Sequence, residues 1–417
     1  MNKLFRGLLS LSMAMVAIAM VGCGKDDAGV KPEPQPEQKP EVKSVSFKVE
    51  DLEYDSVVVT VTPPTSETVY YAFLYPDTEK FMARAPEEIY VDIRYEDNFE
   101  NFLTSGTQTF SYQGLIGHSY YRVVYFEFDE ETGKKVGDIY YSERITTPDA
   151  PEVFDIEISN ITGLSAQITI TPPNDYTTYY YYLYPLADYE AHQHGSDYEL
   201  MQYDYSFWSY MAAIYEKDVA EVIAGDLVAG KVSISTDNIL YLTEWDTEYL
   251  VWAYGITESG IVTTTMTRKV FKTASPATSE MTFEVGNIDV KWYEEETAQG
   301  VLRGWVAEAD IIPSVKNERY FATITNKDWY DWFASANNNG RSDEQYIMSQ
   351  ILLNASTPSA LFPEMCHTGD YKYNCFVERE ILLRPDKEYA VFVFGLDDNG
   401  ATTGLSVFPF KTGPMPQ

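Results

Sequence analysis

The chain has few of the residues that build most catalytic and metal sites. Its 417 residues include 4 histidines and 3 cysteines. It contains no G-x-S-x-G elbow, no H-E-x-x-H pair and no phosphate-binding glycine loop, and no D-x-D-x-D-G loop marks a calcium site. These absences remove the sequence signatures of common hydrolases, zinc enzymes and nucleotide-binding proteins. We therefore predict a protein that is not an enzyme and holds no cofactor.

Basic residues are also scarce. Lysine and arginine together number 30, against 64 aspartates and glutamates, which gives a formal net charge of -34. Such a charge repels phosphate backbones, and no cluster of lysine or arginine offers a local exception. The composition therefore argues against nucleic-acid binding.

The remaining candidates for chemistry are weak. His192 and His194 are close enough to begin a metal site, but no third ligand follows at a usable spacing. Two acids are enough for a glycosidase, and runs such as Glu294–Glu296 exist. With 64 acids in the chain, however, adjacent ones carry little information. A hydrolase stays the least favoured alternative.

Apart from Cys23, the only cysteines are Cys366 and Cys375. The residues between them include a plausible hairpin turn at 368–370, and an even pair suits an exported protein. We predict a disulfide between them, with two free thiols as the alternative.

The N-terminus has the layout of a bacterial secretory signal. Lys3 and Arg6 precede an apolar run that is too short to span a bilayer, and Gly22 stands directly before Cys23. Residues 1–22 resemble the signal peptide of a lipoprotein precursor, although Met20 stands where leucine is commoner. The resemblance implies that Cys23 becomes the mature N-terminus and carries fatty acyl chains.

The residues after Cys23 indicate where such a lipoprotein would be located. Lys25, Asp26 and Asp27 resemble the surface-export signal of Bacteroidota lipoproteins. The proline-rich stretch within residues 23–43 predicts an extended tether. The resemblance implies a protein anchored to outer-membrane lipid through Cys23 and facing the cell exterior.

A pattern of two strands occurs three times. The first strand of each pair alternates apolar and polar residues, and proline follows because it has no N–H for the ladder. An aromatic-rich or apolar second strand ends thirteen residues beyond the first of those prolines in every copy. The first strands are 56–62, 165–171 and 304–312, and the second strands are 70–76, 179–185 and 320–326.

The later half of each copy repeats as well. A leucine stands six or seven residues before a tyrosine that opens a strand, and a closing strand then ends in threonine. The leucine–tyrosine pairs are Leu115/Tyr121, Leu242/Tyr249 and Leu383/Tyr389, and the threonines are Thr147, Thr273 and Thr412. This spacing resembles the tyrosine corner of fibronectin type III and related immunoglobulin-like sandwiches. The resemblance implies a mainly β fold of three tandem sandwiches, at 44–148, 151–275 and 278–414.

Each copy is longer than a plain sandwich because a helical segment follows the second strand. We predict helices within 86–103 and 198–228, and on either side of the break at 337–340. Such insertions vary among the copies, and variable excursions from a rigid sheet are where binding usually resides. The alternative is that the helices only cap the sandwiches.

Aromatic residues are the strongest remaining signal, with 34 tyrosines, 21 phenylalanines and 7 tryptophans. Trp329 and Trp332 are three residues apart on one helical face, and Tyr330 and Asn338 lie nearby. We predict that these four residues contact a ligand, because flat rings stack on pyranose faces while amides bond hydroxyls. The alternative is that both tryptophans pin their helix onto the sandwich.

These observations favour a non-enzymatic surface lipoprotein that acts in adhesion or in the capture of an extracellular ligand. The resemblance to Bacteroidota surface lipoproteins makes a glycan the preferred ligand, by analogy only. A structural spacer, or a subunit of an outer-membrane protein complex, is the alternative.

Overall fold

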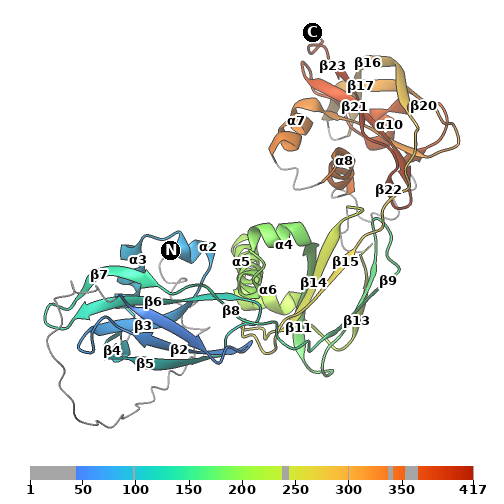
Figure 1. Cartoon of the computed structure of the whole chain (residues 1–417). Coiled ribbons are helices and arrows are strands. Elements are labelled where there is room, and N and C mark those ends of the chain that lie inside the picture. Colours follow the sequence, from blue (N-terminus) through green and yellow to red (C-terminus); the bar gives the residue numbers. More distant parts are fainter. Residues whose placement is uncertain are drawn as a thin grey trace, which may run out of the picture.

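The computed structural model describes residues 44–96, 99–236, 244–298, 300–336, 341–352 and 365–416. The predicted signal peptide and tether, with Cys23, Lys25, Asp26 and Asp27, lie outside the described residues, as does Asn338. The described chain is mainly β, with several antiparallel sheets. Its strands fall into three consecutive groups, called here the N-terminal region (β1–β8), the middle region (β9–β15) and the C-terminal region (β16–β23) (Figure 1).

The N-terminal region carries its helices between the third and fourth strands. Its elements are β1 (Ser46–Glu50), β2 (Ser56–Thr62), β3 (Val69–Pro76), α2 (Glu79–Met82), α3 (Pro86–Arg94), η1 (Phe99–Phe102), β4 (Leu103–Ser105), β5 (Gln108–Gln113), β6 (Tyr120–Asp129), β7 (Lys134–Tyr141) and β8 (Ile145–Thr146).

The middle region has the same order with longer helices. Its elements are β9 (Asp155–Ser159), β10 (Gln167–Thr171), β11 (Thr178–Pro185), α4 (Leu186–His192), α5 (Asp197–Tyr215), α6 (Val219–Asp226), β12 (Val228–Ala229), β13 (Val232–Ser235), β14 (Glu248–Gly255) and β15 (Thr267–Lys272).

The C-terminal region begins with a hairpin of two long strands. Its elements are β16 (Phe283–Thr297), β17 (Gly300–Pro313), β18 (Tyr320–Asn326), α7 (Lys327–Ala336), α8 (Asp343–Leu352), β19 (Cys366–His367), β20 (Tyr371–Asn374), α10 (Cys375–Arg379), β21 (Glu388–Asp397), β22 (Gly400–Ala401) and β23 (Ser406–Lys411).

Each region contains one smaller and one larger antiparallel sheet. The smaller sheets have the orders β1-β2-β5, β13-β10-β9 and β16-β17-β20. The larger ones are β4-β3-β6-β7, β12-β11-β14-β15 and β19-β18-β21-β22, with β8 pairing β6 and β23 pairing β21. The six predicted strands are all present, although β10 begins two residues later than expected and β17 begins four residues earlier.

The core of each region lies between its two sheets, as period-two alternation requires. Val57, Val59 and Val61 of β2 are fully buried, and they share one hydrophobic cluster with Leu74 of β3 and Val123 of β6. Burying a side chain of this kind contributes about 1.5–3 kcal/mol. The middle and C-terminal regions have equivalent clusters.

The same side-chain hydrogen bond recurs in all three regions. A buried tyrosine near the start of the central strand donates its hydroxyl to the carbonyl of a glycine with positive φ (67°, 71° and 68°), a conformation that glycine adopts without strain. The pairs are Tyr70–Gly106 (3.0 Å), Tyr179–Gly230 (2.9 Å) and Tyr320–Gly369 (3.0 Å).

The tyrosine corner also takes its expected geometry in two regions. The hydroxyl of Tyr121 accepts a hydrogen bond from the backbone N–H of Ile116 at 2.9 Å. Tyr389 accepts one from Arg384, also at 2.9 Å. In the middle region Leu242 lies outside the described residues, so the predicted corner there is not tested.

Helices cover the outer face of each larger sheet (Figure 1). The rings that point away from the core pack under those helices: Tyr71 stacks on Phe99, and Tyr180 contacts Trp208 at 4.8 Å. The alternating tyrosines of these strands are therefore buried on both sheet faces, which leaves few of them available to a ligand.

Candidate functional site

Helix α7 begins directly after strand β18. The side chain of Asn326 accepts a hydrogen bond from the backbone N–H of Trp329 at 3.0 Å, as a residue at a helix N-terminus commonly does. Lys327 pairs with Asp331 one turn later, which supports the first turns of the helix. These contacts set which side chains α7 exposes.

Trp329 and Trp332 both face solvent, with 38% and 60% of their surface exposed. They line a surface hollow of about 550 Å³, called here the tryptophan hollow. Its lining residues are Asn326, Asp328, Trp329, Trp332, Arg384, Lys387 and Tyr389. The structure therefore brings both predicted tryptophans to one concave site, together with Asp328 of the same helix and two basic residues from the segment before β21.

The charged wall of the hollow is held by backbone contacts. The Thr412 hydroxyl donates to the carbonyl of Arg384 at 2.7 Å and accepts from the backbone N–H of Lys387 at 3.0 Å. The Tyr389 hydroxyl accepts from the N–H of Arg384. The loop before β21 is thus fixed by the same corner that the sequence motif predicted, and a rigid support is what a binding site needs.

The chemistry of the hollow suits a polar ligand with an apolar face. Indole rings offer flat apolar surfaces, the Asp328 carboxylate accepts hydrogen bonds, and the Arg384 and Lys387 side chains donate them. No ion pair engages Arg384 or Lys387 within the part of the chain that the structure describes. Donors and an acceptor are therefore available beside the rings.

Tyr330, also predicted to contact the ligand, does not line the tryptophan hollow. It is 9% exposed, and its ring packs against Phe392 at 4.9 Å beneath α7. A residue one position after Trp329 points about 100° away around a helix, toward the sheet. Helical spacing alone could have excluded it.

The cysteine pair does not form the predicted disulfide. Neither Cys366 nor Cys375 is part of a disulfide, which is the alternative that the sequence left open. Cys375 is buried in the core between the sheets, where its sulfur accepts from Ala307 N–H at 3.3 Å. Cys366 packs instead with the cluster under α7 and α8. The two thiols thus belong to different packing layers, and burial raises the pKa of each.

Helix α5 exposes an aromatic row that the sequence analysis missed. Tyr203, Phe207, Tyr210 and Ile214 are 47%, 45%, 64% and 52% exposed, and they follow one another at spacings of three and four. Helical spacing did indicate a stripe here, but the two faces of α5 are both apolar. Trp208 and Ala212 take the sheet side, so the periodicity alone could not say which stripe faces water.

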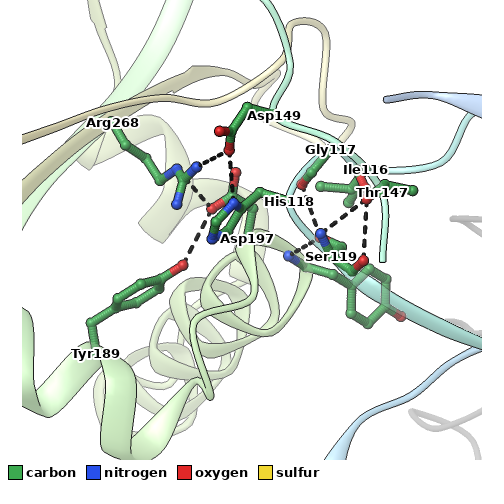
Figure 2. Close-up of polar contacts among 10 residues, drawn as sticks. Ile116, Gly117, His118, Ser119, Thr147, Asp149, Tyr189, Asp197 and Arg268 are labelled. Carbon is green, nitrogen blue, oxygen red and sulfur yellow. Dashed lines mark hydrogen bonds and ion pairs between the residues drawn. The ribbon is translucent and has the colours of Figure 1, made fainter. Parts of the chain in front are cut away.

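A polar joint connects the N-terminal and middle regions (Figure 2). Arg268 of β15 contacts Asp149 at 2.6 Å and Asp197 at 3.2 Å. The His118 ring lies 2.7 Å from the same Asp149 carboxylate, and Tyr189 donates to Asp197 at 3.4 Å. Burial raises the pKa of Asp197 to about 7 and outweighs the opposing effect of Arg268.

Ser119, His118 and Asp149 are the residue types of a catalytic triad, but the geometry is different. The Ser119 hydroxyl is fully buried and donates to the Gly117 carbonyl at 3.0 Å (Figure 2). It also accepts from the backbone N–H of Tyr198 at 3.0 Å. His118 reaches Asp149 and not the serine. These groups hold the joint together and do not form a nucleophile relay.

The two paired histidines point to different partners. His192 lies 2.9 Å from the carbonyl of Asp188 in its own helix, whereas His194 lies 3.1 Å from Glu79 of the N-terminal region. Within the described ranges, no group of three or more His, Cys, Asp or Glu side chains could hold a metal ion. No helix in that part of the chain is both long and apolar enough to cross a membrane.

No protein-family model and no curated protein matches the chain. Among solved structures it is similar to the FN1–FN3 domains of chicken CNTN1 (11% identity, 88% of this chain and 97% of that chain, TM-score 0.21). It is also similar to the central fibronectin-III array of RIM-binding protein (11% identity, 88% and 94%, TM-score 0.15). A third similar structure comes from a 1.5-MDa bacterial ice-binding adhesin (8% identity, 90% and 100%, TM-score 0.15). TM-scores this low describe poor overall superposition of the chains.

Proposed function

We propose that this protein is a non-enzymatic surface lipoprotein that captures an extracellular glycan in the tryptophan hollow. The observation that carries the proposal is the convergence of Trp329 and Trp332 with Asp328, Arg384 and Lys387 around one concave surface. Indoles stack on the apolar face of a sugar ring, and charged groups form the stronger hydrogen bonds to its hydroxyls.

The proposed architecture is three tandem fibronectin-III-like sandwiches, at 44–148, 151–275 and 278–414, each with a helical insertion. The recurring tyrosine–glycine bonds and the matching strand orders support three equivalent units. The insertion stands at the same point of each region, between β3 and β4, β11 and β12, and β18 and β19. Because the insertion point is the same in the three units, the helices can differ while the arrangement of the strands stays the same.

The proposed anchor is lipid on Cys23, with export directed by Lys25, Asp26 and Asp27. Mass spectrometry of the native protein tests it directly: an acylated N-terminal Cys23 is expected. An intact N-terminus without an acyl adduct, or recovery of the protein in the cytosol, would contradict the anchor and the surface location together.

Binding of the purified chain to a panel of neutral and acidic glycans tests the ligand. We expect binding to at least one sugar, and a loss of about tenfold or more in the variants Trp329→Ala and Trp332→Ala. Tyr176→Ala serves as the matched control because Tyr176 is 84% exposed and lies far along the chain from the hollow. No binding across the panel would end the glycan proposal.

A spacer that presents another protein is the second candidate, and the joint between the middle and C-terminal regions favours it. A methyl group on Gly163 would lie 1.7 Å from the Asn399 carbonyl oxygen, and one on Gly400 would lie 2.2 Å from the Trp245 ring. Glycine is required at such close approaches. A tightly fitted joint of this kind limits bending between the two regions.

A further inference from the structure

Strand β11 has an edge that no strand of the described residues covers beyond Tyr179. The Thr178 carbonyl accepts from Ile256 N–H at 3.1 Å, so Thr178 faces β14, while Tyr179 pairs with Val228 of β12. The backbone N–H and C=O groups of successive residues point to opposite edges of a strand. The backbone groups of Tyr181 and Leu183 therefore point to the same edge as those of Tyr179. Strand β12 ends its pairing at Tyr179, and no other described residue hydrogen-bonds the outward backbone groups of Tyr181 or Leu183.

A groove runs beside this edge. It has a volume of about 430 Å³ and lies between β11, helices α5 and α6, and the interior of the facing sheet. Its lining residues are Ile168, Tyr180, Tyr181, Tyr182, Leu183, Phe207, Met211, Tyr215, Val222, Asp226, Ile234 and Val251. One wall is therefore an unpaired strand edge and the opposite wall is a helix.

The walls of the groove are apolar with one charge. Asp226 is the only ionisable acid or base among the lining residues, apart from tyrosines. Antiparallel register places Val228 opposite Tyr179, so Asp226 lies toward the Tyr181 end of the edge. A carboxylate at one end of an apolar groove favours an occupant with a positive charge at that end.

The N-terminal region fills the corresponding space with its own side chains. Phe73 of β3, which is equivalent to Tyr182, packs against Phe102 of η1 at 5.6 Å and against Tyr112 of β5 at 5.5 Å. In the middle region the position equivalent to Tyr112 is Thr236, a much smaller side chain. The space beside β11 is consequently open where the space beside β3 is filled.

We propose that the middle region binds an extended peptide segment of another protein as an added strand on the edge of β11. The segment pairs with the backbone of Tyr181 and Leu183, and main-chain pairing of this kind supplies affinity without a fixed sequence. Its side chains alternate between the α5 wall (Phe207, Met211) and the sheet interior, so both sets are apolar, and a lysine or arginine lies beside Asp226. A glycan fits this groove less well, because apart from the tyrosine hydroxyls only Asp226 offers a polar side chain. A second copy of the chain is a less suitable occupant, because two chains that each carry a net charge of -34 repel each other.

A peptide pool provides the first test. The probe is a pool of hexapeptides with lysine first and valine, isoleucine, threonine or phenylalanine at the other positions, titrated against the full chain by fluorescence anisotropy. The tightest binder is then resynthesised with N-methyl groups on alternate residues, in both possible sets. We expect one set to abolish binding and the other to preserve it, because only one set of N–H groups faces β11. If no peptide binds, or if both methylated sets bind as well as the parent, the proposal is wrong.

Variants of the groove provide the second test. Met211→Lys should weaken the parent peptide by about tenfold or more, and Phe207→Ser is the second variant should Met211→Lys disturb the fold by circular dichroism. Tyr210→Ser is the matched control, because Tyr210 lies on the same helix but does not line the groove. Equal loss in the control would overturn the site.

Removal of the Asp226 charge provides the third test. Asp226→Asn should weaken the lysine peptide and leave a norleucine analogue unchanged, and equal effects on both peptides would overturn the assigned orientation. The tryptophan hollow is unaltered in all these variants, so glycan binding should persist in them. A glycan that loses affinity with Met211→Lys would show that the groove holds sugar instead, and a dimer that this variant dissociates would show a second copy there.

Discussion

Helices α5 and α7 both lie in the insertion that follows the third strand of their region, yet they divide their aromatic residues in opposite ways. Helix α5 buries Trp208 completely against Tyr180 and exposes tyrosines. Helix α7 buries Tyr330 and exposes two tryptophans beside charged groups. The comparison shows that the order of residues along each helix decides which rings are buried against the sheet and which remain exposed to a ligand.

The largest expected difference between the two helices concerns their tryptophans. Trp208→Ala removes a fully buried ring and the 2.8 Å bond from its indole N–H to Asp226, so we expect a loss of about 3–5 kcal/mol in the free energy of unfolding. Trp332→Ala, at an exposed position, should change it by less than about 0.5 kcal/mol. Urea denaturation followed by circular dichroism measures both. Similar losses would mean that Trp332 is a packing residue.

The second difference is a buried acid on the sheet-facing side of α5 itself. Asp204 accepts from Trp252 N–H at 3.2 Å and from the Tyr254 hydroxyl at 3.0 Å, and burial raises its pKa to about 8. The unfolded carboxyl ionises near its ordinary pKa of about 4. Between these values unfolding releases a proton, so stability falls as pH rises, by about 1.4 kcal/mol per pH unit.

Asp204→Asn tests this dependence, because an amide oxygen can accept the same bonds without a charge. From pH 6 to pH 8 the wild type should lose about 2–3 kcal/mol of unfolding free energy relative to the variant, and the gap should stop growing above pH 8. Denaturation curves across this range measure it. Parallel profiles for the two proteins would refute the role of Asp204.

The smallest expected difference concerns the first turns of the helices. Asn326→Ala should cost about 1 kcal/mol and also weaken glycan binding, because the Asn326 contact orients Trp329. Ser196→Ala at the start of α5 removes a longer bond of 3.4 Å to Glu199 N–H, so its cost should be smaller. Thermal unfolding of the two variants compares them. A larger cost for Ser196→Ala would reverse the expected order.

The sequence allowed the strand frame to be predicted because its signals are local. Period-two alternation ending in proline located β2 and β17, and the leucine–tyrosine spacing anticipated the bond between Tyr121 and Ile116. Helix α4 was missed because it starts directly after Pro185 and is only seven residues long, too short to show periodicity.

The candidate site was only half predictable. Trp329 and Trp332 share a helical face, which spacing reveals, whereas Arg384 and Lys387 join them through folding of a segment more than fifty residues away. The groove beside β11 depends on the short length of β12, whose first residue already pairs with Tyr179, and on a small residue at 236, and neither has a local pattern. Non-local packing of this kind cannot be inferred from one sequence.

The most direct measurement is an equilibrium titration of the full chain with the best glycan from the panel, alongside Trp332→Ala and the control Tyr176→Ala. The proposal of a sugar site in the tryptophan hollow predicts an affinity reduced by about tenfold or more in Trp332→Ala and unchanged in the control. An affinity in Trp332→Ala equal to that of the wild type would contradict it.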